Sequence, residues 1–421
     1  MNCTLALSTV RSGVHLVVSG SKSETNRLRL LQALYPYLQV ENASNSDDSE
    51  VMIQALEKSK NSNSNPVYID VHHAGTAMRF LTAFFAIQEG KEVLLTGSTR
   101  MQERPIQLLV DALIQLGAVI TYENKPGFPP LRIHGQKLTR SQVTLPANMS
   151  SQYISALLLI APTLEQGLEL TLTGAITSLP YINMTLALLN AIGVRTSFEG
   201  NVVTVSPYQP QVISSQPTIV TVESDWSSVS YWYSIIALSP VGTQITLSRF
   251  KPKSVQGDHI LAVLYAKLSV ETEFLADDQI RLTKVALPPV SHFEAHLSDT
   301  PDLAQTLVVS CLGLGIGCSL TGLQTLKIKE TDRLQALYNE LTKLGATVTF
   351  TNDALALAPT AQLHADCTIA TYQDHRMAMA FAPLALRVPL VIENAEVVSK
   401  SYPEFWNDLE QLGIHFSMSE K

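Results

Sequence analysis

A helix, a turn residue and a pair of strands recur along this chain at a nearly constant spacing. The residues expected at the turns are Gly117, Gly193, Ser269, Gly345 and Gly413, which follow one another at intervals of 76, 76, 76 and 68 residues. Glycine after a helical pattern supplies the left-handed backbone that ends a helix. The pattern predicts β-α-β-α-β-β for each repeat, with about six copies if the degenerate N-terminal stretch is counted.

The length of the chain predicts two domains. Its 421 residues exceed what one hydrophobic core usually serves, and 46% hydrophobic against 16% charged residues fits a compact enzyme. The period is too long for a solenoid. We therefore expect an α/β fold whose subdomains surround shared helices, three subdomains in each domain.

Charge and cysteine content exclude several classes of protein. The 29 Lys and Arg residues against 37 Asp and Glu residues give a net charge of −8, which argues against non-specific nucleic-acid binding. The four cysteines form no CxxC pair and no zinc-like spacing with histidine, so we expect reduced thiols and no metal. Apolar stretches such as 154–162 are too short to span a bilayer. We expect a soluble, cytoplasmic protein.

The run 329–334, Lys-Glu-Thr-Asp-Arg-Leu, brackets two carboxylates with two cations. Taken alone, it predicts an exposed first helical turn capped by Thr331 or Asp332. Similar groups of Lys, Arg and Ser recur at the edges of other apolar segments. Together these groups indicate a site for a multiply charged anion.

The first of these groups, SGSKSETNRL, precedes a helix predicted over 28–34. Ser21 or Ser23 can cap this helix, so that its free N–H groups face the same ligand as Lys22. Lys22 and Arg27 have the wrong sign for the positive end of a helix dipole, which favours an anion as their partner. An ordinary capped helix is an equally good interpretation of this segment alone.

Two further segments combine glycine with arginine. Gly75 precedes an apolar helix and lets the backbone approach a ligand closely. Arg100 and Arg104 share a loop after the strand-like residues 93–95, and two arginines can bind phosphate or carboxylate through paired hydrogen bonds. In isolation, a solvated surface loop explains these arginines as well.

Serines begin two more helices. Ser150, Ser151 and Gln152 open an apolar helix, and hydroxyls with free backbone N–H groups at a helix start can bind an oxyanion. Ser178 repeats the arrangement before Pro180, with Tyr181 following. A simple N-cap needs only one serine at each place.

Charged residues at three later helix starts complete the set. Asp302 follows a proline and is an ordinary cap by default, but becomes a general base if a substrate hydroxyl lies within about 3 Å. Arg376 follows His375 before a helix rich in Met and Ala, and Lys400 precedes Ser-Tyr-Pro. His375 fits a buried structural histidine equally well. Motifs of other enzyme classes, GxxxxGK[ST], GxGxxG, GxSxG and HExxH, are absent from the sequence.

These motifs resemble, in their order, those of the 5-enolpyruvylshikimate-3-phosphate synthase family. The resemblance runs from about Ser19 to Pro403 through the Lys22-Ser23 start, AGTAMR, RMQERP, SSQ, SLPYI, KETDRL, DHRMAMA and SKSYPEF. It implies two domains of three βαβαββ repeats around buried helices. One domain would comprise residues 1–20 plus 224–421 and the other residues 21–223, with the active site in the cleft between them.

The resemblance also implies the activity. The family transfers the enolpyruvyl group of phosphoenolpyruvate to the 5-hydroxyl of shikimate 3-phosphate, releases phosphate, and is inhibited by glyphosate. We expect no cofactor, these two small-molecule partners, no membrane or nucleic-acid partner, and a monomer. The nearest alternative is the related transferase acting on UDP-N-acetylglucosamine, whose loop at 99–105 typically carries a cysteine that this chain lacks. A non-catalytic repeat protein is the second alternative.

Site residues carried over by motif fall into three groups. The catalytic residues would be Asp302 as proton acceptor, Glu330 for the carbon-bound proton, Lys22 and Lys329. The residues expected to bind shikimate 3-phosphate are Lys22, Ser23, Arg27, Ser150, Ser151, Gln152, Ser178, Tyr181, Asp302 and Lys329. The residues expected to bind phosphoenolpyruvate are Lys22, Gly75, Arg104, Gln152, Arg333, Arg376 and Lys400.

The chain departs from the family pattern at three positions. His73 stands where asparagine is common, Phe80 where proline is common, and Thr325 where asparagine is usual. His73 and Thr325 put individual side-chain contacts in question, and Phe80 affects the helix behind Gly75. None of the three replaces a charged catalytic group.

Overall fold

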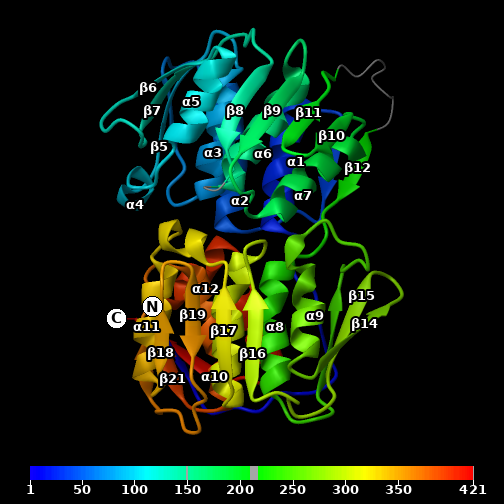
Figure 1. Ribbon diagram of the computed structural model, residues 1–421, viewed down its shortest axis with the longest axis vertical. Helices are drawn as coiled ribbons and strands as arrows, with labels where there is room; N and C mark the ends of the chain where they lie inside the picture. The colour runs from blue at the N-terminus through cyan, green and yellow to red at the C-terminus, as the bar shows by residue number, and fades with distance from the viewer. Residues whose placement is uncertain (148–149, 209–216, 421) are drawn as a thin grey trace. The chain divides into compact units, whose positions relative to one another are not determined.

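A computed structural model describes residues 1–147, 150–208 and 217–420 of the chain (Figure 1). The chain divides into two compact units, which are described separately below. Unit 1 comprises Met1–Ser21 with Glu223–Lys421, and unit 2 comprises Lys22–Val222. Each unit has its own hydrophobic core, as expected for a chain of this length.

Three four-stranded sheets form in the described part of unit 1. Their strand orders are β14(Val270–Leu275), β15(Gln279–Lys284), β13(Gln244–Ser248), β2(Val14–Leu16); β16(His292–His296), β17(Gly317–Thr321), β19(Ala354–Leu357), β18(Val348–Phe350); and β20(Cys367–Ile369), β21(Leu390–Ile392), β1(Asn2–Leu5), β22(Phe416–Ser419). In each sheet one pair is parallel and the other pairs are antiparallel.

Unit 2 repeats this architecture. Its sheets have the orders β4(Val67–Asp70), β5(Glu92–Thr96), β7(Leu131–His134), β6(Val119–Tyr122) and β10(Thr196–Glu199), β11(Val202–Val205), β9(Leu168–Thr173), β8(Gln142–Pro146). Among the described residues of this unit, a third sheet consists of a parallel pair, β12(Thr218–Thr221) with β3(Leu38–Glu41). The predicted α/β repeat is thereby confirmed, and strand β1 from the N-terminus completes the last copy.

The helices connect these strands. Unit 2 contains α1(Lys22–Leu34), α2(Asp47–Asn61), α3(Gly75–Ala86), α4(Thr99–Gln102), α5(Gln107–Leu116), α6(Ser151–Ile160), η1(Ala161–Thr163) and α7(Leu179–Ala191). Unit 1 contains α8(Trp226–Leu238), η2(Gly257–Ile260), α9(Leu261–Ala266), η3(Pro301–Leu303), α10(Ala304–Leu314), η4(Gln324–Ile328), α11(Arg333–Lys343), α12(His375–Phe381), η5(Ala382–Leu386), η6(Ala395–Lys400) and α13(Phe405–Gln411).

Several helices are apolar on every side and form the interior of their unit. Helix α12 is buried throughout, while α3, α6 and α8 each have one residue that is not buried. These residues are Thr76, Gln152 and Ser227, each the second residue of its helix. A helix apolar all round belongs in a core. These three helices are therefore accessible only at their N-terminal ends, where free N–H groups favour anions.

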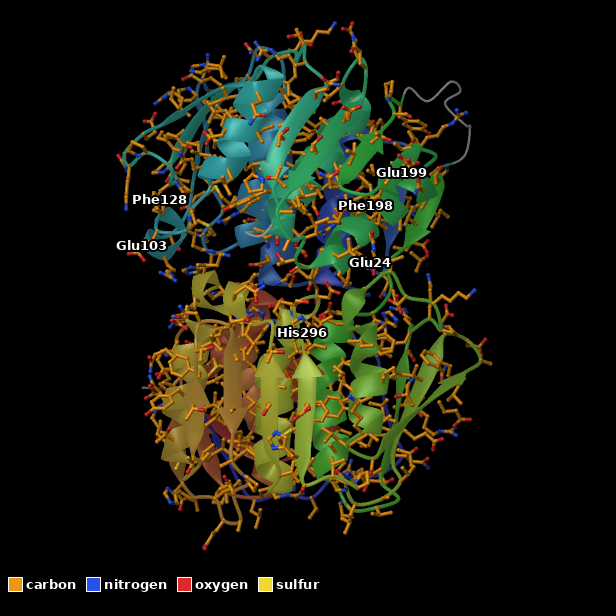
Figure 2. The ribbon with its side chains drawn as sticks, in the orientation of Figure 1. Glu24, Glu103, Phe128, Phe198, Glu199 and His296 are labelled. Atoms are coloured by element: carbon orange, nitrogen blue, oxygen red, sulfur yellow. The ribbon has the colours of Figure 1, made fainter. Side chains whose placement is uncertain are left out.

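Along the strands, successive side chains alternate between facing the core and facing solvent. Figure 2 labels Phe198 and Glu199 on β10, where Phe198 packs against the core of unit 2 and Glu199 is exposed. Successive side chains of a strand point to opposite faces of the sheet. The predicted hairpins at 199–201, 276–278 and 351–353 join β10 to β11, β14 to β15 and β18 to β19.

All five predicted turn residues have a left-handed backbone. Their φ values are 106° at Gly117, 95° at Gly193, 61° at Ser269, 91° at Gly345 and 87° at Gly413. Ser269 takes this conformation although it carries a Cβ, and its hydroxyl donates to the Leu287 carbonyl at 3.0 Å. The left-handed backbone therefore recurs at the same position of each repeat. Glycine usually occupies this position, but serine can also adopt the conformation.

Replacing Gly117 by alanine should destabilise the protein by about 1–2 kcal/mol, the cost of a left-handed residue with a side chain. A Cβ there would lie 3.8 Å from the nearest Thr139 atom, so steric overlap contributes nothing. Urea denaturation of both proteins measures the difference. Equal stability of the Gly117→Ala variant would contradict the assignment of Gly117 as a conformational stop.

One predicted boundary is wrong. Helix α1 begins at Lys22 rather than at Leu28, so Lys22, Ser23 and Arg27 lie within the helix and not before it. The spacing of apolar residues did not predict this start, because the first turns of α1 are polar. Glu24, Thr25, Asn26 and Arg27 are nevertheless buried.

Candidate functional site

Arg333 is the centre of an ion-pair cluster in unit 1. It is the first residue of α11, which Asp332 caps by accepting from the Gln335 N–H at 3.1 Å. The predicted capping role of Asp332 is thus confirmed. The Arg333 side chain is 2% exposed and lies inside unit 1.

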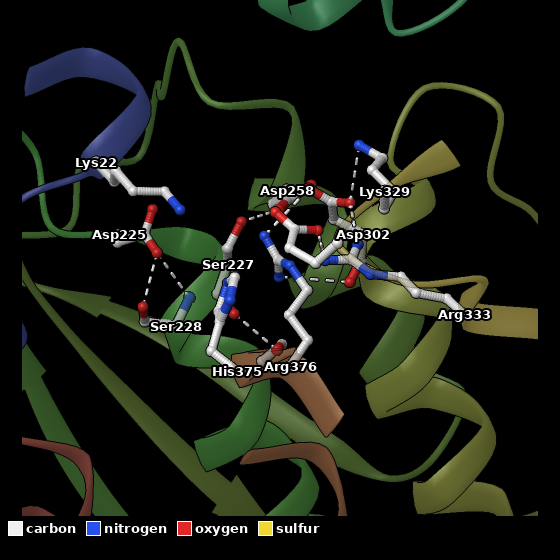
Figure 3. Close-up of polar contacts among 12 residues, drawn as sticks. Lys22, Asp225, Ser227, Ser228, Asp258, Asp302, Lys329, Arg333, His375 and Arg376 are labelled. Carbon is white, nitrogen blue, oxygen red and sulfur yellow. Dashed lines mark hydrogen bonds and ion pairs between the residues drawn. The ribbon is translucent and has the colours of Figure 1, made fainter. Parts of the chain in front are cut away.

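Three carboxylates surround the Arg333 guanidinium, and one of them, Asp302, is labelled beside it in Figure 3. Its Nη1 donates to Asp302 Oδ1 at 2.7 Å, its Nη2 to Glu330 Oε2 at 2.9 Å, and its Nε to Asp374 Oδ2 at 2.7 Å. Burial alone would lower the pKa of Arg333, but these carboxylates outweigh it and raise that pKa above its usual value. Arg333 therefore stays charged in a buried place.

Asp302 forms ion pairs with three cations of unit 1. Arg376 Nη2 lies 3.1 Å from Asp302 Oδ2, and Lys329 Nζ lies 3.3 Å from Oδ1, in addition to Arg333. Burial alone would raise the pKa of the Asp302 carboxyl, but the positive charges of Arg376, Lys329 and Arg333 hold it well below its usual range. Asp302 is consequently ionised at neutral pH and weakly basic as it stands.

Asp374 is a member of this cluster that the sequence reasoning missed as a site residue. Its side chain is fully buried, and Oδ1 accepts from the Arg376 N–H at 2.9 Å as the N-cap of α12. The same carboxylate holds Arg333. An Asp directly before a helix start was visible in the sequence, but a cap is its ordinary role. Its second partner lies 41 residues away, which local patterns do not reveal.

A strained turn precedes Asp374. Tyr372 and Gln373 have φ values of 53° and 57°, which residues with a side chain adopt only at a cost. The Lys400 ammonium donates to the Gln373 carbonyl at 2.9 Å. The Tyr372 hydroxyl donates to Glu340 at 2.6 Å. These contacts hold the turn that presents Asp374, His375 and Arg376.

Lys22, the first residue of α1, pairs with a carboxylate of unit 2. Its ammonium lies 3.1 Å from Asp48 Oδ2, with side-chain exposures of 18% and 11%. Asp48 is in the first turn of α2 and was not among the predicted site residues. Ser23 is the next residue of α1 and is partly exposed. A carboxylate therefore already partners Lys22 within unit 2.

Arg27 lies deeper than its neighbours in α1. It is 2% exposed and donates to Thr185 Oγ1 at 2.7 Å, to Ser155 Oγ at 2.9 Å and to the Ser23 carbonyl at 2.8 Å. Its guanidinium carbon lies 5.3 Å from the centre of the Phe80 ring, a cation–π distance. Burial lowers the pKa of Arg27 to about 10, which leaves it charged at neutral pH. Phe80, one of the departures from the family pattern, thus supports this arginine.

Gly75 and Arg104 are in contact. A Cβ added at Gly75 would lie 2.6 Å from Arg104 Nη1 and 2.9 Å from Nη2. Arg104 is 8% exposed, and its Nε is buried without a hydrogen-bond partner in the described residues. Gly75 and Arg104, both among the predicted site residues, therefore lie against each other, with the Arg104 guanidinium over the start of α3.

The serine-rich helix starts differ from each other. Ser150 caps α6 by accepting from the Gln152 N–H at 3.3 Å, whereas Ser151 is a helical residue. Gln152 Nε2 donates to Thr76 Oγ1 at 3.2 Å, which links the starts of α6 and α3. Ser178 has a left-handed φ of 55° before α7. The Tyr181 carbonyl accepts from Thr185 at 2.9 Å and from Arg27 at 3.3 Å.

The other two departures from the family pattern, His73 and Thr325, differ in their hydrogen bonding. His73 Nδ1 lies 2.8 Å from Ser98 Oγ, within hydrogen-bond distance. Thr325 is 9% exposed, and its hydroxyl is buried without a hydrogen-bond partner in the residues described. A buried hydroxyl without a partner is costly, so Thr325 is the less well satisfied of the two.

Neither a metal site nor a membrane helix is found in the described parts of the chain. No group of three or more His, Cys, Asp or Glu side chains there is arranged to hold a metal ion. No helix there is both long and apolar enough to cross a membrane.

Comparisons with known proteins agree with the motif series. The sequence model of a family described as EPSP synthase (3-phosphoshikimate 1-carboxyvinyltransferase) matches residues 10–409. A 3-phosphoshikimate 1-carboxyvinyltransferase of Bacteroides fragilis is 47% identical over 408 residues, covering 95% of both chains. The enzyme of the same name from Laribacter hongkongensis is 35% identical over 428 residues, covering 96% of this chain and 97% of its own.

Solved structures show the same fold. An EPSP synthase from Acinetobacter baumannii superposes with a TM-score of 0.78 at 21% identity, covering 100% of both chains. The enolpyruvyl transferase NikO from Streptomyces tendae has a TM-score of 0.71 at 14% identity, covering 100% of this chain and 99% of its own. At these identities the likeness concerns the fold.

Proposed function

The chain belongs to the EPSP synthase family, and we propose that it transfers the enolpyruvyl group of phosphoenolpyruvate to the 5-hydroxyl of shikimate 3-phosphate. Phosphate is the second product. This is an enzymatic step of the shikimate pathway, which leads to aromatic amino acids. The observation that carries the proposal is the convergence of Lys329, Arg333 and Arg376 on the Asp302 carboxylate.

The reaction needs both an acid and a base. In the addition step the 5-hydroxyl oxygen bonds to C2 of phosphoenolpyruvate, loses its proton, and the methylene carbon gains one. In the elimination step the bond from C2 to the phosphate oxygen breaks, and the methyl carbon loses a proton. Groups that accept and return protons at two places are therefore required.

Asp302 is proposed to accept the hydroxyl proton, with Lys329 beside it. Its depressed pKa suits this role only when substrate is present. An anion bound to Arg376 and Arg333 offsets the charges that depress that pKa, so the basicity of Asp302 rises in the substrate complex. Lys329, 3.3 Å from Asp302, then stabilises the oxygen as it loses its proton.

Glu330 is proposed to deliver and later remove the proton on the methylene carbon. Its carboxylate is held by Arg333 at 2.9 Å, and its side chain is 20% exposed. Glu330 is therefore both positioned and accessible, which a proton carrier requires.

The anions are proposed to bind at the basic and hydroxyl groups of both units. Phosphoenolpyruvate would contact Lys22, Gly75, Arg104, Gln152, Arg333, Arg376 and Lys400. Shikimate 3-phosphate would contact Lys22, Ser23, Arg27, Ser150, Ser151, Gln152, Ser178, Tyr181, Asp302 and Lys329. Support comes from the helix starts of α3 and α6, which are accessible only at the ends that favour anions.

The proposed domains are residues 1–20 plus 224–421 and residues 21–223. The two compact units support this division, since their boundaries at Ser21/Lys22 and Val222/Glu223 lie next to the predicted ones. We further propose a monomeric cytoplasmic enzyme that does not bind nucleic acid. The excess of 37 acidic over 29 basic residues supports the last point.

A phosphate-release assay tests the proposed function. The purified protein is given phosphoenolpyruvate with shikimate 3-phosphate or with UDP-N-acetylglucosamine, and the organic product is identified by mass spectrometry. We expect release only with shikimate 3-phosphate. Release only with the nucleotide sugar would assign the related transferase activity, and release with neither would indicate a non-catalytic protein.

Gly75→Ala should raise the KM for phosphoenolpyruvate by about tenfold, which corresponds to 1.4 kcal/mol of lost binding. The new methyl group would displace the Arg104 guanidinium, which is flexible enough to move without unfolding α3. Inhibition by glyphosate should weaken in parallel, because the methyl group crowds the same pocket. Initial rates measured over a range of phosphoenolpyruvate and glyphosate concentrations give both constants.

The matched control for this prediction is the same substitution in an Arg104→Ala background. The methyl group then has no guanidinium to displace, so Gly75→Ala should add little further change to the KM. A full additional effect in that background would show that the methyl group acts through something other than Arg104.

A further inference from the structure

Asp258 is a buried acid that the proposed chemistry does not use. It is 4% exposed and lies in η2 of unit 1. One carboxylate oxygen accepts a hydrogen bond from the Ser227 hydroxyl. The other, Oδ1, is buried and has no hydrogen-bond partner among the described residues. An ionised carboxylate with one unsatisfied oxygen is costly to keep in the interior.

Gln256 anchors the start of η2, the short helix that carries Asp258. The Gln256 side chain accepts from the Trp226 N–H at 2.9 Å and donates to the Ser224 carbonyl at 2.9 Å. Because Gln256 is itself 4% exposed, these bonds fix the start of η2 against the start of α8. The element that carries Asp258 is thereby fixed beside α8, where the Ser227 hydroxyl donates to the Asp258 carboxylate.

The charges that face Asp258 come from three other elements. Arg376 of α12 attracts it, whereas Asp302 of η3 and Asp225, the N-cap of α8, repel it. Figure 3 shows Asp258 beside Ser227 and Arg376. Burial is the largest effect and raises the pKa of Asp258 to about 6, although Arg376 and the Ser227 hydroxyl act in the opposite direction.

Arg376 therefore acts on two carboxylates unequally: it forms an ion pair with Asp302 at 3.1 Å and attracts Asp258 electrostatically. Asp302 has Lys329 and Arg333 as further cationic partners, at 3.3 and 2.7 Å. Arg376 is the cation that acts most strongly on Asp258. A substrate anion at Arg376 would weaken its attraction for both acids and add a repulsion to each. Asp302 would remain ionised, because its other cations stay beside it.

We infer that Asp258 is a positioning residue that takes up a proton from solvent when the anionic substrate binds at Arg376. The inference rests on the proposed function, since it needs phosphoenolpyruvate at Arg376. Protonation removes a negative charge next to the bound anion and relieves the buried oxygen that lacks a partner. The charge of Arg376 then acts on the substrate without the competing attraction of a second ionised carboxylate.

The test compares wild type with Asp258→Asn, which mimics the neutral acid. The KM for phosphoenolpyruvate is measured by phosphate release at saturating shikimate 3-phosphate from about pH 5.5 to 8.5, a range centred above the usual carboxyl pKa. The ratio of the wild-type KM to the variant KM cancels the ionisation of phosphoenolpyruvate itself. We expect this ratio to be near one at the acid end, where both side chains are neutral.

The same ratio should rise with pH above about 6, since only the wild type must then take up a proton to bind. At high pH the KM ratio should level off at a value that is about tenfold for each pH unit by which substrate binding raises the pKa of Asp258. Asp408→Asn is the matched control. Asp408 is a 7% exposed acid whose pKa burial also raises, but its partner at 2.6 Å is the Tyr402 hydroxyl. The ratio for this control should not vary with pH.

Ser227→Ala gives a second measurement that keeps the Asp258 carboxyl. Removing the hydroxyl that stabilises the ionised form raises the pKa of Asp258 further, so the rise in KM should begin at a higher pH than in wild type. This variant answers the question even if Asp258→Asn fails to fold.

The outcomes separate the inference from the proposed function. A KM ratio that stays constant across the pH range, in enzymes that release phosphate, would overturn the role of Asp258 and leave the proposed function intact. Absence of phosphate release from wild type with both substrates would overturn the proposed function itself.

Discussion

Replacing Asp302 by asparagine should lower kcat by about 10²- to 10⁴-fold, the usual contribution of a positioned general base. The amide cannot accept the proton of the substrate hydroxyl, but it retains the shape of the carboxylate. The KM for phosphoenolpyruvate should stay the same or fall, because the carboxylate that competes for Arg333 and Arg376 is gone. Steady-state phosphate release measures both parameters.

The split between kcat and KM distinguishes catalysis from structural support. A purely structural role would raise the KM together with a loss of stability, whereas we expect Asp302→Asn to remain folded by circular dichroism. Asp299→Asn is the matched control, since Asp299 lies in the segment just before η3 and is exposed. Unchanged turnover in Asp302→Asn would remove Asp302 as the proton acceptor.

Replacing Arg333 by methionine should cost about 3–5 kcal/mol of stability at pH 7, the usual loss when one partner of a buried ion pair is removed. Methionine keeps an unbranched side-chain stem but leaves Asp302, Glu330 and Asp374 without their shared cation. Urea denaturation measures this loss. Phosphate release should also disappear, because Arg333 is proposed to bind phosphoenolpyruvate.

The stability loss in Arg333→Met should depend on pH. In wild type the pKa of Asp302 lies below its unfolded value, so the stability it contributes is present above about pH 4 and is lost as the pH falls further. Without Arg333, Asp302 loses one of the cations that depress its pKa, so Asp302 takes up a proton at higher pH than in wild type. The difference between the two proteins should therefore be largest at neutral pH and shrink on acidification.

Arg132→Met is the control for this prediction. Arg132 also contacts two carboxylates, Glu123 at 2.7 Å and Glu92 at 2.6 Å, but its side chain is 30% exposed. Because water screens exposed ion pairs, its removal should cost much less. If Arg333→Met and Arg132→Met lost equal stability, burial would not be the reason that the Arg333 ion pairs stabilise the protein.

Features that depend on neighbouring residues were predictable from the sequence. The left-handed turns at Gly117 and Gly345 follow from the local need to end a helix, and the Asp332 cap follows from the residues next to it. The start of α1 was not predictable in this way. Its first turns are polar, and only the packing of unit 2 buries Glu24 and Arg27.

The partners of the charged residues were not predictable from the sequence. Asp302 lies 31 residues from Arg333 and 74 from Arg376, and Asp374 lies 41 from Arg333. Their types and order allowed the family to be named, but no periodicity specifies which carboxylate meets which cation. Asp48 and Asp258 were missed for the same reason.

The sequence by itself therefore determined the repeat and the two-core organisation, and it supplied the list of side chains proposed to bind anions, because periodicity, capping and motif order can be read along the chain. Only the tertiary structure decided that Asp302 is shared by three cations, that Asp374 holds Arg333, and that Arg27 is buried against Phe80. The physical reason is that the energy of a buried charge depends on its surroundings in space, which the chain assembles from distant segments.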